Sequence, residues 1–334
     1  MNKMMVKALA FSVAALFAAG VAQAQVNSHT FRLSTAGATG HPSIPGGEKF
    51  GELVSQKSGG KMTVKVFAAG VLGGDVQALS AVQGGTIDFT VMNSGILQTQ
   101  VKEFAIFDFP FMFLSGKQAD GVLDGPFGQK MADLLPPKGL INLAYWELGF
   151  RQLTNSKRLI KSADDISGLK IRVIQSPIYL DTWSALGANP VPMPFTEVYT
   201  ALEQKVIDGQ ENPFSVILTS KLNEVQKYLA ITNHMYNPQS LLMSKKVWDR
   251  LTKDEQKILV DSAKEATATQ RKYARDVADQ AIGELKKTME ITSLPPAEIA
   301  KIQAKLKPVI DKYSANVGAD LVKELQAALA KAPQ

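Results

Sequence analysis

The stretch MTVKVFAAGVLGGDVQALSAVQGGTIDFTVM, residues 62–92, contains the unit that decides the fold. Residues 62–67 alternate apolar and polar side chains, which predicts a β-strand. Residues 75–82 predict a helix that ends at Gly84 and Gly85, and residues 87–92 predict the next strand. A strand–helix–strand order is typical of an α/β layer with a mostly parallel sheet.

The same order continues on both sides of this unit. Further strands are predicted at 31–33 and 169–174, and further helices at 44–58, 177–186 and 195–204. Extended pieces are predicted at 140–145, 148–154, 188–192, 228–234 and 240–244, and some of these would cross between layers. Two α/β layers in one chain predict two lobes.

A long helix is predicted after these layers. Residues 252–255, Thr-Lys-Asp-Glu, form a capping box, and the helical pattern runs from there to about Glu290. At 1.5 Å per residue this helix would be roughly 50 to 60 Å long, which is longer than one small domain. We therefore expect it to span both lobes, and the alternative is two shorter helices with a break.

The N-terminal residues have the pattern of a secretory signal peptide. Lys3 and Lys7 precede an apolar stretch at 8–21, and residues 22–24 form an Ala-Gln-Ala cleavage site. The alternative, an uncleaved membrane anchor, requires a longer apolar run. We expect residues 1–24 to be removed and the mature chain, from Gln25, to lie in the periplasm.

Composition excludes several classes of function. The chain has no cysteine, which removes thiol nucleophiles and thiolate metal sites. Of its 37 basic residues, 35 remain after Lys3 and Lys7 are removed, against 31 acidic ones, and they are scattered, so nucleic acid is not an expected partner. The three histidines lack metal-ligand spacing, and no nucleophile elbow, dinucleotide fingerprint or P-loop is present. We expect no enzyme, no metal and no cofactor.

Arginine and amide side chains are the remaining candidates for binding. Arg172 lies inside the strand predicted at 169–174, between Ile171 and Val173. On a cleft wall its planar guanidinium would hold a carboxylate through two parallel hydrogen bonds, each contributing roughly 1.5–3 kcal/mol. On an outer face it would be a solvated charge, and the pattern alone leaves both open. For Arg151 and Asn212 the pattern leaves the same two alternatives open, a position on a cleft wall or on an outer face.

Several motifs together resemble one family, the solute-binding subunits of TRAP (tripartite ATP-independent periplasmic) transporters. The motifs occur in order along nearly the whole mature chain: 72–75 (LGGD), 88–90 (DFT), 109–111 (FPF), 168–173 (GLKIRV), 192–199 (PMPFTEVY), 206–213 (VIDGQENP) and 224–234 (EVQKYLAITNH). The resemblance implies a two-lobed α/β periplasmic binding protein whose long helix spans both lobes. The expected lobes are 25–149 with 238–277, and 150–237 with 278–334.

The resemblance also implies roles for site residues. Arg172 would clamp the ligand carboxylate, Arg151 and Asn212 would support it, and Phe195 would pack beside the ligand. Asn93 and Asp75 would face the cleft from the first lobe; some sialic-acid-binding relatives carry an acid at the position of Asn93, which argues against that ligand. The remaining expected contacts lie beside matched motifs: Gln175, Glu147 and Trp146, the last either stacked on a sugar ring or buried in the core.

The resemblance implies a small organic acid as ligand and the TRAP membrane subunits as partners. A sugar acid such as a uronate or aldonate is the first expectation, and a C4-dicarboxylate or another small carboxylate is the alternative. A periplasmic enzyme or a sensor on the same scaffold are further alternatives. The chain has no coiled-coil heptads, and we expect a monomer.

Overall fold

The computed structural model describes residues 26–333, so the predicted signal peptide and its cleavage site lie outside the described residues. The ten strands of this part are β1 (His29–Thr35), β2 (Met62–Phe67), β3 (Phe89–Asn93), β4 (Leu140–Asn155), β5 (Lys170–Val173), β6 (Asn189–Pro192), β7 (Gly209–Pro213), β8 (Tyr228–Ile231), β9 (Tyr236–Ser244) and β10 (Glu290–Ser293). Their order is β2-β1-β3-β9-β4-β7-β5-β6, with β8 paired to β4 and β10.

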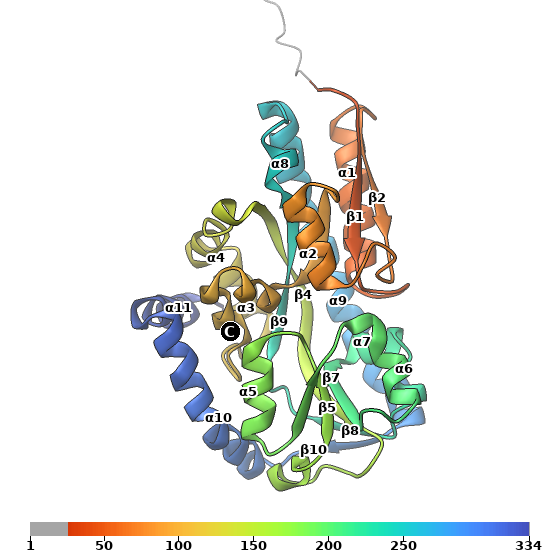
Figure 1. The fold of residues 1–334 in the computed structure, drawn as a ribbon, viewed down its shortest axis with the longest axis vertical. Coiled ribbons are helices and arrows are strands. Elements are labelled where there is room, and N and C mark those ends of the chain that lie inside the picture. The colour runs from red at the N-terminus through yellow and green to blue at the C-terminus, as the bar shows by residue number, and fades with distance from the viewer. Residues whose placement is uncertain (1–25, 334) are drawn as a thin grey trace, which may run out of the picture.

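Helices surround these strands along an elongated molecule (Figure 1). They are α1 (Ser43–Lys57), α2 (Asp75–Gly84), α3 (Gly116–Leu123), α4 (Pro126–Ala132), α5 (Pro177–Ala185), α6 (Val198–Glu203), α7 (Phe214–Thr219), α8 (Lys245–Trp248), α9 (Lys253–Thr288), α10 (Pro296–Val317) and α11 (Ala319–Lys331). Short 3₁₀ helices are η1 (Ser94–Thr99), η2 (Lys102–Asp108), η3 (Pro136–Lys138), η4 (Ala163–Ile166), η5 (Phe195–Glu197) and η6 (Leu222–Glu224). Within residues 26–333, no helix has the length and apolar character that crossing a membrane requires.

Two parallel layers are joined by antiparallel strands in the middle. β1 pairs in parallel with β2 and β3, and β5 pairs in parallel with β6 and β7. Between them, β9 pairs antiparallel with β3 and β4, and β4 pairs antiparallel with β7. The expected α/β architecture with two parallel layers is confirmed.

Strand β4 connects the layers. Its first part, to Phe150, pairs with β9, and the part from Arg151 onward pairs with β7 and β8. Its pairing register shifts between Glu147 and Gly149, and Gly149 has φ +112°. The two extended pieces predicted at 140–145 and 148–154 are therefore one 16-residue strand with a bulge, which bends the strand where the layers meet.

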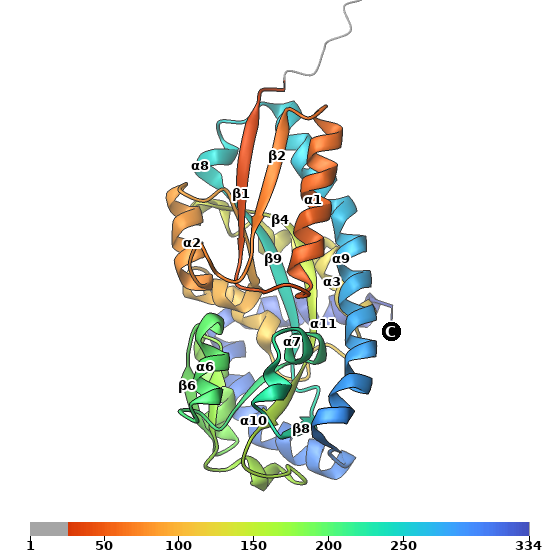
Figure 2. The same ribbon diagram turned by 90° about the vertical axis from the view of Figure 1, so that its right-hand side faces the viewer.

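Helix α9 is unbroken over 36 residues, or about 54 Å at 1.5 Å per residue. Its predicted capping box between Thr252 and Glu255 is present, and the alternative of two shorter helices is wrong. Figure 2 shows α9 running along both layers. Gln270 of α9 accepts from the Glu147 backbone N–H (2.8 Å) and donates to the Glu147 carbonyl (2.7 Å), so the helix is fixed to β4 beside the bulge.

The apolar core follows the layers. One cluster joins β1, β3 and α1 to α9 and includes Phe50, Phe89 and Trp146. Another joins α6 and α7 to the last turns of α9. Helix α10 packs against α5 and η2, and α11 packs against α3 and α4, so the C-terminal helices contact both predicted lobes. The residue limits of the lobes stay a prediction.

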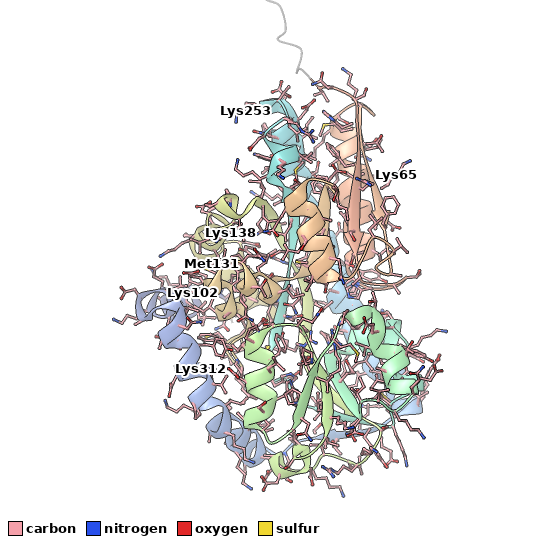
Figure 3. The ribbon with its side chains drawn as sticks, viewed as in Figure 1. Lys65, Lys102, Met131, Lys138, Lys253 and Lys312 are labelled. Carbon is pink, nitrogen blue, oxygen red and sulfur yellow. The ribbon has the colours of Figure 1, made fainter. Side chains whose placement is uncertain are left out.

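Surface charge is distributed over many elements. Figure 3 labels Lys65 on β2, Lys102 on η2, Lys138 on η3, Lys253 on α9 and Lys312 on α10. Many lysines pair with acids one helical turn away, such as Lys257 with Asp261 at 2.6 Å. These lysines thus belong to solvated surfaces, as the scattered sequence positions predict.

Candidate functional site

A cavity of about 40 Å³ lies between the two layers. The elements that supply its walls meet near the middle of the long axis (Figure 1). One wall comes from the first layer and its loops: Thr35, Ala36, Gly37, His41, Asp75, Val91, Asn93 and Gln239. The other wall comes from the central strand β4 and the second layer: Leu148, Arg151, Arg172, Ile174, Phe195, Asn212 and Val216.

Arg172 lies in the wall of this cavity and is only 3% exposed, so the alternative of a solvated outer-face arginine is wrong. Its Nε and Nη2 both donate to the Met193 carbonyl, at 2.9 and 2.7 Å. No described residue accepts from Nη1, which leaves donors for an anion. Burial and the nearby Arg151 lower the pKa of Arg172 to about 10, and the guanidinium remains charged at neutral pH.

The Arg172 guanidinium also contacts an aromatic ring. Its central carbon lies 5.8 Å from the centroid of the Phe195 ring, within the range of a cation–π interaction. Phe195 lies just after β6 and is half-buried, with its centroid 6.5 Å from that of His41 on the opposite wall. The predicted neighbours Arg172 and Phe195 are therefore brought together, and Phe195 bridges the two walls.

Arg151 is fully buried, and each of its three guanidinium nitrogens already donates to a neighbouring residue. It forms a two-point contact with Glu211, Nε to Oε2 at 2.5 Å and Nη2 to Oε1 at 2.9 Å, and Nη1 donates to Asn237 at 2.9 Å. Although burial opposes ionisation of Glu211, Arg151 and His234 hold the pKa of Glu211 below its usual value. Glu211 thus neutralises Arg151, while Arg172 has no such ion pair among the described residues.

Sequence reasoning missed the buried pair of Glu211 and His234. The Nε2 of His234 lies 3.1 Å from Oε2 of Glu211, and its Nδ1 lies 2.8 Å from Thr232 Oγ1. Both side chains are buried. The available signal was an acid inside the motif 206–213, because its last five residues form the fully buried strand β7 and a buried acid needs a cationic partner.

The two predicted amides reach the cavity from opposite walls. Asn212 accepts from Arg151 Nη2 (3.1 Å) and donates to Gln210 (2.6 Å). Asn93 donates to Asn237 (2.6 Å), the same amide oxygen that accepts from Arg151. Through Asn237 the two walls therefore share one hydrogen-bond network with Arg151.

Asp75 lies on the first wall as the first residue of α2, directly after Gly74. Burial raises the pKa of its carboxyl to about 6, and Arg172 across the cavity opposes that rise. The N-terminus of a helix stabilises a negative charge. At neutral pH this wall therefore presents an anion.

Three polar cavity residues carried no sequence signal: Thr35, His41 and Gln239. Thr35 Oγ1 bonds to Ser43 Oγ (2.8 Å), which bonds to His41 Nδ1 (2.8 Å). Burial lowers the pKa of His41 to about 4, so its ring is neutral. Gln239 is 5% exposed, and its Oε1 has no hydrogen-bond partner among the described residues. Thr35 ends β1, His41 lies in the loop that follows, and Gln239 lies on β9, so only the fold brings Gln239 to the other two.

Three predicted contacts do not line the cavity. Trp146 is fully buried in the core beside α1 and α9 and donates to Thr267 at 3.2 Å, so the core alternative holds. Glu147 lies next to it at the bulge and pairs with Arg275 of α9 at 2.5 Å. Gln175 is half-buried outside the lining. Adjacency to a motif did not predict the lining of the cavity, because that lining depends on how strands and loops of both layers come together.

Two α/β layers joined by central strands, with a buried cavity between them that places Arg172 opposite Asp75, define a two-lobed solute-binding protein. A match to the bacterial extracellular solute-binding proteins, family 7, covers residues 33–316, and the chain belongs to that family. This confirms the TRAP resemblance, the two-lobed fold and the expectation that the protein is not an enzyme, since the family consists of transporter solute-binding proteins that work with membrane permease subunits. Among residues 26–333 no group of side chains suited to a metal occurs.

Solved and curated relatives cover most of the chain. A sugar-acid-binding protein from Advenella mimigardefordensis, solved with galactonate, is 41% identical, has a TM-score of 0.90 and covers 92% of this chain and 100% of its own. The 2,3-diketo-L-gulonate-binding periplasmic protein of Escherichia coli is 39% identical over 72% of this chain and 73% of its own. A TRAP periplasmic solute-binding protein from Sulfurospirillum deleyianum, solved with succinate, is 31% identical with a TM-score of 0.86, over 90% and 99% of the two chains.

Proposed function

We propose that the protein captures a sugar acid such as an aldonate or uronate in the cavity at Arg172 and delivers it to the TRAP membrane subunits. The observation that carries this proposal is the buried Arg172 guanidinium, whose Nη1 has no partner among the described residues. The relatives that bind galactonate and 2,3-diketo-L-gulonate support a sugar acid.

In this proposal the ligand carboxylate bonds to the free edge of the Arg172 guanidinium. Asn212 lies on the same wall, and Arg151 contributes by holding Asn212 in place, because Glu211 already neutralises its own charge. Each charge-assisted hydrogen bond contributes roughly 1.5–3 kcal/mol, and exclusion of water strengthens it. Two such bonds are enough to make Arg172 the dominant contact.

Ligand entry requires the two walls to separate. A cavity of about 40 Å³ is filled by a few water molecules, which is less space than a sugar acid occupies. Contacts across the walls hold the described conformation closed: Gln98 of η1 donates to Ser176 before α5, and Phe195 lies beside His41. The strands β4 and β9 continue through both layers, so we propose that bending near the β4 bulge opens the cleft between the predicted lobes.

The same proposal includes secretion through the predicted signal peptide at residues 1–24 and a monomeric periplasmic protein. The family's extracellular description agrees with that location. Analytical ultracentrifugation of protein purified from the periplasm, with N-terminal sequencing, tests both: we expect a monomer beginning at Gln25, and an N-terminus at Met1 would contradict cleavage.

Calorimetric titration with D-galactonate tests the clamp. We expect Arg172→Ala to weaken binding by about 10²–10⁴-fold, the loss of two charge-assisted bonds at about 1.4 kcal/mol per tenfold. Arg250→Ala, which removes an exposed arginine, is the matched control and should bind as the wild type does. Near-normal affinity of Arg172→Ala, with an unchanged unfolding temperature of the free protein, would count against the proposal.

A C4-dicarboxylate is the second candidate, favoured by the relative solved with succinate. A thermal-shift screen with galactonate, galacturonate and succinate separates the candidates, because a ligand that binds the native state raises its unfolding temperature. If succinate alone raises the unfolding temperature, the ligand is a dicarboxylate and not a sugar acid.

A further inference from the structure

The two walls of the cavity differ in charge. Among the described lining residues, the ionisable side chains are Arg151 and Arg172 on one wall and Asp75 and His41 on the other. The wall with Asp75 therefore contains no cation, since His41 is buried and neutral. A negatively charged group on the ligand would find no ionic partner there.

Two side chains of this wall, Asp75 and Gln239, present acceptors to the cavity. Asp75 supplies two carboxylate oxygens at the N-terminus of the ten-residue helix α2. Gln239 of β9 supplies Oε1, which is buried and has no partner among the described residues. Its strand neighbour in the pairing of β3 with β9 is Asn93, another cavity residue. An unpartnered buried acceptor is costly unless a ligand supplies a donor.

One neutral donor on this wall, besides the amide groups of Asn93 and Gln239, is set by the histidine tautomer. His41 Nδ1 accepts from the Ser43 backbone N–H at 3.2 Å, which places the ring hydrogen on Nε2. A hydroxyl group is both donor and acceptor, so it can satisfy Asp75 or Gln239 and also accept from His41. A carboxylate accepts only and would repel Asp75.

The charge balance of the whole site also disfavours a second carboxylate on the ligand. Glu211 neutralises Arg151, and Asp75 faces Arg172 across the cavity, so the charges of these four side chains sum to zero when all are ionised. A ligand with one carboxylate adds one negative charge close to Arg172. A second carboxylate would add another beside Asp75, where no counter-ion is present among the lining residues.

We propose that Asp75 and Gln239 select hydroxyl groups on a monocarboxylate and exclude a second carboxylate, so that the site discriminates hydroxy acids from dicarboxylates. This inference rests on the proposed function, because it assumes that Arg172 holds the first carboxylate. The wall with Asp75 and Gln239 would thus select the end of the ligand that lies away from the carboxylate held by Arg172.

Titration with D-galactonate and galactarate tests the inference, because the two share six carbons and four hydroxyls but galactarate has a carboxylate at both ends. At pH 7.5 we expect the wild type to bind galactonate at least about a hundredfold more tightly. Asp75→Asn should reduce that ratio at least tenfold, with galactarate gaining affinity. Gln239→Met should lower the affinity for galactonate by about tenfold without raising the affinity for galactarate.

The control is Asp320→Asn, which changes the same net charge at a side chain 96% exposed on α11 and should leave the ratio unchanged. Unfolding temperatures of the ligand-free variants verify folding. Equal affinity of the wild type for both acids, or an unchanged ratio in a folded Asp75→Asn, overturns the inference while carboxylate capture stands. If the wild type binds neither these acids nor any other carboxylate, the proposed function fails instead.

Discussion

Burial sets the protonation of single residues at the centre of this molecule. Asp108 at the end of η2 is fully buried, accepts from Tyr179 at 3.2 Å, and has a second oxygen, Oδ2, without a partner among the described residues. Burial raises the pKa of Asp108 to about 7, while Arg151 opposes the rise and Glu211 adds to it. Asp108 is thus a carboxyl near its titration point, hydrogen-bonded through Tyr179 and Asn237 to the cavity network.

We predict a pH effect on stability from Asp108. Its pKa is raised from 3.8 in the unfolded chain to about 7, so the folded protein keeps a proton that the unfolded chain has released. The stability contribution of Asp108 is therefore fully present below 3.8 and falls as pH rises through about 7, by at most about 1.4 kcal/mol per pH unit. Urea unfolding of the wild type and Asp108→Asn between pH 4 and 8 measures it, and a pH-independent difference would contradict it.

Close backbone approach makes Gly95 a second sensitive residue. A Cβ at Gly95 would lie 1.3 Å from Asp108 Oδ2, a distance that requires the carboxyl or the η1 backbone to move. We expect Gly95→Ala to lower the free energy of unfolding by about 1–3 kcal/mol or more. Gly283→Ala, with nothing within 4 Å of its added Cβ inside α9, should instead stabilise the protein by up to about 1 kcal/mol. Equal effects in denaturant titrations would contradict the steric argument.

The site was only partly predictable from single residues. Arg172, Arg151, Asn212, Phe195, Asn93 and Asp75 all line the cavity. The different tasks of the two arginines were not predictable, because Glu211 neutralises only Arg151 and that pairing depends on the register of β4 with β7. Residues inferred from adjacency alone, such as Trp146, do not line the cavity, because their positions depend on tertiary packing and not on the motif beside them.

At the scale of elements, α9 and β4 differ in what the sequence could predict. The capping box and unbroken periodicity of α9 are local signals, so its start and length were predictable. The bulge of β4 at 147–149 depends on pairing with β9 and on the hydrogen bonds from Gln270, which lie far away in sequence. A local pattern therefore predicted two extended pieces where tertiary pairing forms one bent strand.

The attachment of α9 to that bulge gives an element-scale prediction. Gln270→Met removes both hydrogen bonds to Glu147 and leaves a buried backbone N–H and carbonyl without partners. At about 1–3 kcal/mol for each unsatisfied group, we expect a loss of about 2–5 kcal/mol in denaturant titrations. Lys264→Met on the exposed face of α9 is the control. A loss no larger than that of the control would show that α9 packing alone holds the bulge.

At the scale of the whole molecule, the fold would couple the proposed ligand capture to the proposed opening of the cleft. The cavity takes Arg172 and Phe195 from one layer and Asp75 and Gln239 from the other, so neither layer alone forms the site. A ligand that contacts both walls stabilises only the closed arrangement and shifts the population toward it. The connections between the layers, β4, β9 and α9, are continuous elements, so opening would have to bend them.

This coupling is measurable because the chain has no native cysteine, so labels can be placed at chosen sites alone. Lys65 on β2 and Lys312 on α10 are exposed and lie in opposite halves of the molecule (Figure 3). With spin labels at Lys65→Cys and Lys312→Cys, we expect saturating D-galactonate to change the mean distance and narrow its distribution. The same pair in an Arg172→Ala background should not respond, because the clamp on one wall is absent. A distribution unaffected by galactonate, at concentrations where calorimetry shows binding, would mean that the ligand is held without lobe closure, and the layers would then act as a rigid frame.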